Sequence, residues 1–354
     1  MNNAMMTQQN NPQMMQQNMP QNMLMQCIPF DPTRADKRYK ISLMNTTITQ
    51  SKFGSFKGFP KPKSTVSAFV SNFNPGPPNN ICEVSVLFEH ALDIAEQYAE
   101  KGVNISPQNG MNPVILNVVG REFTGTSMET NDNVRDEIIT IRTTFNTSIG
   151  TSSPYPLKED ECCYSRPITV IKPKNCATWM TPQGWLSWQQ TYRTAVITTS
   201  PIVATNLLSE NKMSADDFIK TCSIIECIFQ TAYNQRHAVL ILSPFGHVED
   251  NNPVGDVIKI YNYCIFKYGH LFRKIIIGVP PHYPRPIFER YGREIVKPNE
   301  LAMEVEKKYE REESKRNLIE RGNQCLNKKN INKNVEDKPV AKNYTIFGHV
   351  ISGM

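Results

Sequence analysis

Residues 114–145 read VILNVVGREFTGTSMETNDNVRDEIITIRTTF, and this stretch decides the fold class. It begins with a short apolar run, 114–119, which is typical of a strand buried on both faces. A turn rich in small residues follows. Polar residues then lead from Asn131 into a helix that we expect to reach Phe145. A buried strand, a loop and a helix in this order indicate an α/β protein.

The same alternation continues along the chain. Apolar runs predict further strands at 167–171, 195–199, 238–243 and 274–279. Helical spacing predicts helices over 214–235, with Ser214 as N-cap, and over 256–267. Together these elements indicate a largely parallel sheet covered on both faces.

Apolar residues at Val84, Leu87, Ala91, Ile94 and Tyr98 also recur at helical spacing, so we expect one more helix there. Ligands of such sheets bind beyond the carboxyl ends of the strands. The sequence therefore directs attention to the two strand-exit loops, 120–137 and 243–254.

Composition excludes several protein classes. The chain has 354 residues, 39% of them hydrophobic, and no run approaches the ~18 apolar residues of a membrane span. Its nine cysteines form neither a CxxC pair nor a zinc spacing, so we expect buried, reduced thiols and neither a metal nor another cofactor. The net charge of +6 is mild, and we expect neither a membrane nor a nucleic-acid partner.

We expect an intracellular protein, cytoplasmic or nuclear, because the N-terminal stretch lacks a basic segment followed by an apolar one. The composition leans toward Asn, Lys and Ile, as in AT-rich genomes, so a virus-infected host cell is one expected setting.

Five parts are predicted along the chain. They are a disordered Met/Gln/Asn-rich tail (1–30), a loop-rich N-terminal extension (31–79), the main domain (80–297), a charged helix (298–322) and an Asn/Lys-rich tail (323–354). The N-terminal tail and the charged helix are the candidate sites for self-association or for binding a protein partner.

The segment after the first strand resembles the bacterial-type poly(ADP-ribose) glycohydrolases, a branch of the macrodomain superfamily. Their signature is three glycines, six to eight residues, and then Gln-Glu-Glu. Here Gly125-Thr126-Ser127 stands at the glycines, seven residues follow, and Arg135-Asp136-Glu137 stands at Gln-Glu-Glu. Asn117-Val118-Val119 resembles the family's Asn-Phe-Ala strand exit, and 142–145 resembles its Arg-Thr-Thr-Leu continuation.

A second segment is similar to the same family. Residues 242–248 resemble its Gly-Cys-Gly loop, and Asn252-Pro253 resembles the Asn-Pro that precedes a helix. The resemblance spans roughly 80–279 in the family's order. It implies a macrodomain-like three-layer α/β sandwich, with a mixed, mostly parallel central sheet and helices on both faces.

The resemblance also implies a site. Glu137 would protonate the departing ribose oxygen and then activate water, and Asp136 would hold ribose hydroxyls. The implied ligand-binding residues are Asn117, Gly125, Thr126, Ser127, Arg135, Phe245, Gly246, His247 and Val248. The implied ligand is ADP-ribose or an ADP-ribosylated protein, with its pyrophosphate between 125–127 and 246–248.

The signature is degenerate. Thr126 and Ser127 carry a Cβ where the family has glycine, Asp136 is one methylene shorter than Glu, and His247-Val248 replaces Cys-Gly. Three functions therefore stay open. They are an ADP-ribosyl hydrolase, an ADP-ribose-binding module that has lost turnover, and a catalytically inactive scaffold whose tails make partner contacts.

Overall fold

The computed structural model describes residues 37–77, 80–101, 112–120, 137–147, 155–174, 184–204, 207, 212–247 and 250–295. Its strands are β1 (Lys63–Ala68), β2 (Glu83–Leu87), β3 (Pro113–Val118), β4 (Glu161–Val170), β5 (Tyr192–Thr199), β6 (Val239–Leu242) and β7 (Lys274–Gly278). Its helices are α1 (Lys37–Lys52), α2 (Ala91–Glu96), α3 (Glu137–Arg142), α4 (Ala215–Asn234), α5 (Val254–Tyr268) and α6 (Arg285–Glu294), with short 3-10 turns at Phe145–Thr147 and Gly269–Leu271.

The strands form one seven-stranded sheet in the order β1-β4-β5-β3-β6-β7-β2. The five strands from β5 to β2 are paired in parallel, whereas β4 runs antiparallel to both β5 and β1. Strand β3 is completely buried, as expected of a central parallel strand with helices on both faces. The predicted mixed, mostly parallel sheet is confirmed.

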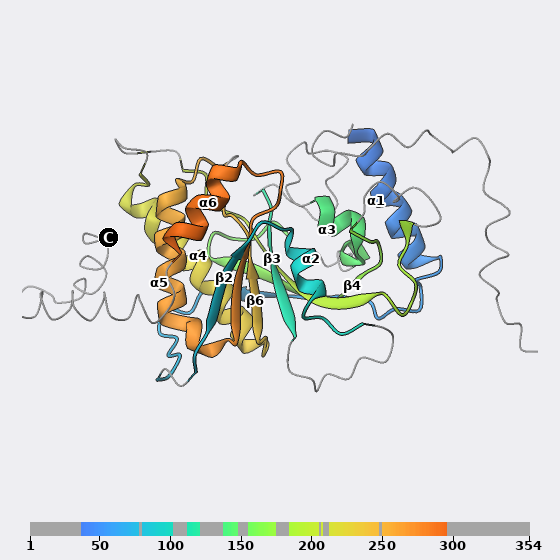
Figure 1. Cartoon of the computed structure of the whole chain (residues 1–354), viewed down its shortest axis with the longest axis horizontal. Helices are drawn as coiled ribbons and strands as arrows, with labels where there is room; N and C mark the ends of the chain where they lie inside the picture. The colour runs from blue at the N-terminus through green and yellow to red at the C-terminus, as the bar shows by residue number, and fades with distance from the viewer. Residues whose placement is uncertain are drawn as a thin grey trace, which may run out of the picture.

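Helices cover both faces of the sheet, which gives the predicted three-layer sandwich (Figure 1). On one face, which we call the α4–α5 face, these two helices pack on the even-numbered positions of β3, such as Val114 and Leu116. On the other, the α2–α3 face, α2 and Ile139 of α3 pack on Ile115 and Val119. Helix α1 lies outside α3, where Leu43 contacts Ile141.

Most predicted elements are confirmed, and two regions differ. The helix expected to include Val84 and Leu87 is instead β2 followed by α2. Val84 and Val86 alternate onto the core of the α4–α5 face, whereas Leu87 packs on the opposite face, as the two-residue period of a strand requires. The extension predicted to be loop-rich contains α1 and β1. Strand β1 is short and polar, and its register with β4, Lys63 opposite Arg166, adds it to the sheet.

The six described cysteines are free and buried, as expected. Within the described ranges, no helix has the length and apolar character needed to cross a bilayer. The predictions for the tails and for the charged helix fall on residues outside the described ranges.

Candidate functional site

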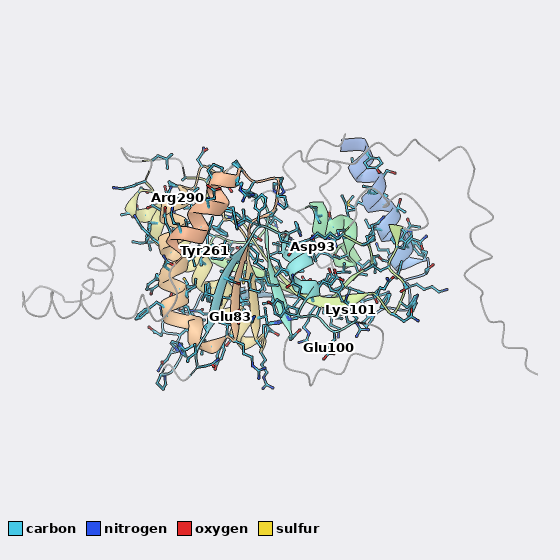
Figure 2. The ribbon with its side chains drawn as sticks, in the orientation of Figure 1. Glu83, Asp93, Glu100, Lys101, Tyr261 and Arg290 are labelled. Atoms are coloured by element: carbon cyan, nitrogen blue, oxygen red, sulfur yellow. The ribbon has the colours of Figure 1, made fainter. Side chains whose placement is uncertain are left out.

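The carboxyl ends of β3, β5 and β6 lie at one edge of the sheet, because β3 pairs in parallel with both neighbours. The two predicted strand-exit loops therefore leave adjacent strands at this edge, which we call the carboxyl edge. In Figure 2, Arg290 of α6 lies on the upper side of the molecule, toward the carboxyl edge, whereas Glu83 marks the start of β2 at the opposite, amino edge.

Asn117 lies one residue before the end of β3. Its side chain is only 1% exposed, and it faces the α2–α3 side because strand residues alternate and Ile115 and Val119 lie there. Its Nδ2 donates to Thr198 Oγ1 at 3.3 Å, whereas its Oδ1 has no partner among the described residues. Among the described residues, this buried oxygen is thus an acceptor that no donor uses.

Gly246 makes the turn that follows β6. Its φ of +70° is in the left-handed region, which glycine adopts without steric cost. A Cβ at this position would meet Asn252 Nδ2 at 2.1 Å and Pro201 Cβ at 3.0 Å. The turn therefore requires glycine for its conformation and for the space around it.

The turn is tied to the segment that follows β5. The amide of Asn252 donates to Gly246 O at 2.9 Å, and its side-chain Nδ2 donates to Ile202 O at 3.1 Å. Ala204 N donates to Asp250 O at 2.9 Å. These bonds hold two neighbouring strand exits as one unit, and Asn252 Oδ1 remains a buried acceptor with no partner among the described residues.

His247 stabilises the Gly246 turn through both of its ring nitrogens. Its Nδ1 donates to Asn252 O at 3.1 Å, and its Nε2 accepts from the Tyr291 hydroxyl at 2.5 Å. Burial, with a smaller contribution from the Arg290 charge, lowers the pKa of His247 to about 4. The imidazole is therefore neutral at physiological pH and fastens the turn to α6.

Phe245 is fully buried in the core of the α4–α5 face, so its side chain packs there and only its backbone is available at the carboxyl edge. Helix α5 begins at Val254, shortly after the Gly246 turn, and the guanidinium of Arg290 lies beside Gly255 in its first turn. Arg290 is itself paired with Glu294, with 2.8 Å between Nε and Oε1, and Asp256 lies in the first turn of α5, so carboxylates already accompany the cation here.

Glu137 is the first residue of α3, on the α2–α3 face. This short helix is anchored at its other end. Arg142 Nη1 forms a buried ion pair with Asp93 Oδ1 of α2 at 2.8 Å, and its Nε donates to Lys172 O at 3.3 Å. Thr47 of α1 donates to Ile141 O at 2.6 Å. The backbone that carries Glu137 is thus fixed against three other elements.

The structure brings Asn117, Gly246 and His247 to the carboxyl edge, and it places the Glu137 backbone on the face toward which Asn117 points. The remaining predicted site residues, and the Glu137 side chain, fall outside the described part of the chain; those residues are Gly125, Thr126, Ser127, Arg135, Asp136 and Val248. Their roles stay predictions.

The sequence analysis missed three supporting residues. Asn252 was noted only as part of an Asn-Pro pair, although its position before a helix is a signal for a loop-closing role. Tyr291 lies on α6, which starts after Pro284 and was not predicted, although Ile287 and Tyr291 show an i, i+4 apolar spacing. Asp93, the partner of Arg142, lies 49 residues away, and no local pattern indicates that pairing.

No protein-family model matches the chain. No curated protein matches it either. Among solved structures, poly(ADP-ribose) glycohydrolase from Thermomonospora curvata is similar with a TM-score of 0.51 at 11% identity, over 73% of this chain and 97% of that one. The enzyme from Deinococcus radiodurans in complex with ADP-ribose gives 0.49 at 12% identity, over 71% and 96%. The Thermomonospora curvata enzyme bound to the inhibitor ADP-HPD gives 0.48 at 13%, over 73% and 97%.

The fold is thus the macrodomain-like α/β sandwich of a bacterial poly(ADP-ribose) glycohydrolase, as the resemblance in the sequence implied. The likeness extends over nearly the whole length of the Thermomonospora curvata chain. At this level of identity the comparison establishes the architecture.

Proposed function

We propose that the chain binds ADP-ribose at the carboxyl edge and that Glu137 catalyses hydrolysis of an ADP-ribosyl linkage there. The observation that carries the proposal is the Gly246 turn. It is a left-handed glycine turn, held rigidly between the exits of β5 and β6, at the edge where ligands bind in parallel sheets. The Thermomonospora curvata enzyme, which shares the fold, is a glycohydrolase of poly(ADP-ribose).

The turn supplies a surface for a diphosphate. A residue without a Cβ lets backbone amides approach phosphate oxygens closely. The pyrophosphate then lies between residues 246–248 and 125–127, and the free oxygen of Asn117 accepts a hydrogen bond from a ribose hydroxyl.

Glu137 acts as general acid and then as general base. Its carboxyl protonates the departing oxygen as the bond from that oxygen to the ribose anomeric carbon breaks. The carboxylate then removes a proton from a water molecule that attacks the same carbon, which restores the carboxyl and releases ADP-ribose. Asp136 holds the ribose hydroxyls, and its negative charge favours the protonated form of Glu137.

The test combines binding and turnover. Titration calorimetry with ADP-ribose, and release of ADP-ribose from a modified protein, are measured for the wild type and for Glu137→Gln. We expect the substitution to retain ADP-ribose binding and to lower turnover by about 10²–10⁴-fold, the usual contribution of acid–base assistance. Gly246→Val should abolish both, because its side chain would collide with Asn252.

Glu289→Gln is the matched control, since Glu289 is an exposed carboxylate of α6 paired with Arg285 at 3.3 Å. It should leave binding and turnover unchanged. Equal turnover by wild type and Glu137→Gln would remove Glu137 from the mechanism. Binding without turnover in the wild type would leave recognition as the function, and no binding at millimolar ADP-ribose would favour the scaffold.

A further inference from the structure

The described part of the N-terminal extension, residues 37–77, contacts the helix that carries Glu137. Helix α1 lies beside α3 (Figure 1), and Leu43 of α1 packs with Ile141 of α3 in a small buried cluster. The extension precedes the stretch, 80–279, over which the sequence resembles the glycohydrolases. The family signature therefore assigns it no role, and its effect on α3 has to be read from its contacts.

Helix α3 is too short to be stable by itself. It has only six residues, and the four from 138 to 141 are β-branched, so their side chains lose rotational freedom in a helix. The carbonyl groups in the last turn of a helix have no partner within that helix. In α3 they must therefore accept hydrogen bonds from other segments if the helix is to keep its position.

The extension supplies one such hydrogen bond directly. The hydroxyl of Thr47, a residue that is 1% exposed, donates to Ile141 O at 2.6 Å. The same hydroxyl lies 3.0 Å from Leu43 O in its own helix, so the contact with α3 is the shorter of the two. Ile141 follows Glu137 by one helical turn, about 5.4 Å along the axis. The bond thus fixes the backbone one turn away from the proposed catalytic residue.

A second contact reaches the same end of α3 through another segment. Phe56 and Phe59, which follow α1, pack on Ile171 directly after β4, and their rings are stacked with 5.7 Å between centroids. The amide of Ile171 donates to the carbonyl of Arg142, the last residue of α3, at 2.9 Å. The extension therefore supports two successive carbonyls of this helix.

We propose that the N-terminal extension holds α3 in place and that Thr47 is a positioning residue for Glu137. The inference rests on the proposed function, because it concerns the residue proposed as general acid and base. Thr47 is buried and acts through the backbone of α3. A misplacement of about 1 Å can lower turnover by about 10²-fold, so loss of this bond should lower turnover. Asn117 and Gly246, on other elements, should still bind ADP-ribose.

The test changes the hydroxyl and little else. Thr47→Val keeps the size and branching of the side chain without the donor, whereas Thr47→Ser keeps the donor. Thr46→Val is the matched control, since the Thr46 hydroxyl donates to Ser42 O within its own helix at 2.8 Å. For each chain, kcat and KM are measured for release of ADP-ribose from a modified protein, the Kd of ADP-ribose by calorimetry, and the exchange of α3 amide hydrogens by mass spectrometry.

Thr47→Val should lower kcat by about 10- to 100-fold and leave the Kd of ADP-ribose unchanged. The amides of α3 should exchange about 3- to 10-fold faster, as for the loss of one hydrogen bond. Thr47→Ser should recover most of both effects, and Thr46→Val should behave as the wild type. Urea unfolding of each variant confirms that all are folded under the assay conditions.

Three outcomes would overturn the inference. They are an unchanged kcat in Thr47→Val, equal losses in Thr47→Val and Thr47→Ser, and equal exchange of the α3 amides in Thr47→Val and Thr46→Val. Failure of the proposed function gives a different result, namely no turnover by the wild type or equal turnover by Glu137→Gln. The exchange of the α3 amides would then still decide whether Thr47 holds this helix.

Discussion

The two faces of the sheet are held by different forces. On the α4–α5 face, helices of 20 and 15 residues pack a continuous apolar core on the strands. On the α2–α3 face the two helices have six residues each, too short to be stable alone. Long-range polar contacts compensate there, since Tyr192 donates its hydroxyl to Leu92 O at 3.0 Å and Arg142 pairs with Asp93.

The difference bears on the residue that is proposed for catalysis. An apolar layer tolerates many substitutions, because its stability is spread over many contacts. The opposite layer depends on a few buried polar bonds, and it carries Glu137. The geometry of the proposed catalytic helix therefore depends on residues that touch no ligand.

The largest effect should come from Arg142→Ala. It leaves the Asp93 carboxylate, 8% exposed, with only the exposed Lys174 at 3.9 Å as a cation, and breaking a buried pair costs about 3–5 kcal/mol. Urea unfolding followed by circular dichroism measures this loss. Lys220→Ala, which breaks an exposed pair with Glu159 at 3.6 Å, should cost no more than about 1 kcal/mol.

Replacing both members of the Arg142–Asp93 pair tests the same dependence of the α2–α3 face on this ion pair. Arg142→Met combined with Asp93→Leu removes both charges and should recover most of the loss, since apolar pairs often replace buried ion pairs without penalty. If Arg142→Ala cost less than Lys220→Ala, the α2–α3 face would not depend on this pair.

The next largest effect should be the loss of stability at acidic pH, which depends on the α4–α5 side. Burial lowers the pKa of His237 from 6.5 to about 4, so between these values the unfolded chain binds a proton that the folded chain does not. Stability therefore falls as pH falls through this window, by about 3 kcal/mol for this histidine at about 1.4 kcal/mol per pKa unit. Unfolding free energies from pH 7 to pH 4 measure the slope.

His237→Gln should remove about half of the slope, because His247, whose pKa burial also lowers to about 4, keeps its own share. His282→Gln, at an exposed position, should leave the slope as in the wild type. An unchanged slope in His237→Gln would show that the proton is taken up elsewhere.

The smallest effect on stability should come from the N-cap of α4, on the α4–α5 face. Ser214 caps α4 by accepting from Asp217 N at 3.1 Å, and Ser214→Ala should cost about 1 kcal/mol. Ser214→Asn should retain most of the wild-type stability, because asparagine caps equally well. Thermal unfolding compares the two variants, and equal losses in both would mean that the cap hydrogen bond contributes little.

The elements predicted from sequence are those with local signals. Buried strands such as β3 and β6 are continuous apolar runs, and α4 has both a cap residue and a helical apolar stripe. Strand β2 was mistaken for helix because Val84 and Leu87, three residues apart, continue the helical spacing of α2, whereas Val84 and Val86 are the pair that shares a face of the strand. Strand β1 was missed because it is polar, and its place is set by pairing with β4.

The residues of the candidate site divide in the same way, into those with a local sequence signal and those placed by contacts between distant segments. Gly246 was predicted from a loop resemblance and lies at the expected edge, with a backbone conformation that explains the glycine. The bonds that hold it, from Asn252 and Tyr291, join segments far apart in sequence, so no window of residues reveals them. Phe245, beside this glycine, packs its side chain into the core, so its predicted ligand contact is restricted to the backbone.

The anchoring of α3 determines when this helix becomes stable during folding. The contacts of Arg142 join residues 93, 142 and 172, so the six-residue α3 is stable only once this part of the domain has folded. A nascent chain, a proteolytic fragment or a loosened intermediate would thus contain Glu137 without holding its backbone in a fixed position. The proposed hydrolysis therefore requires the folded domain.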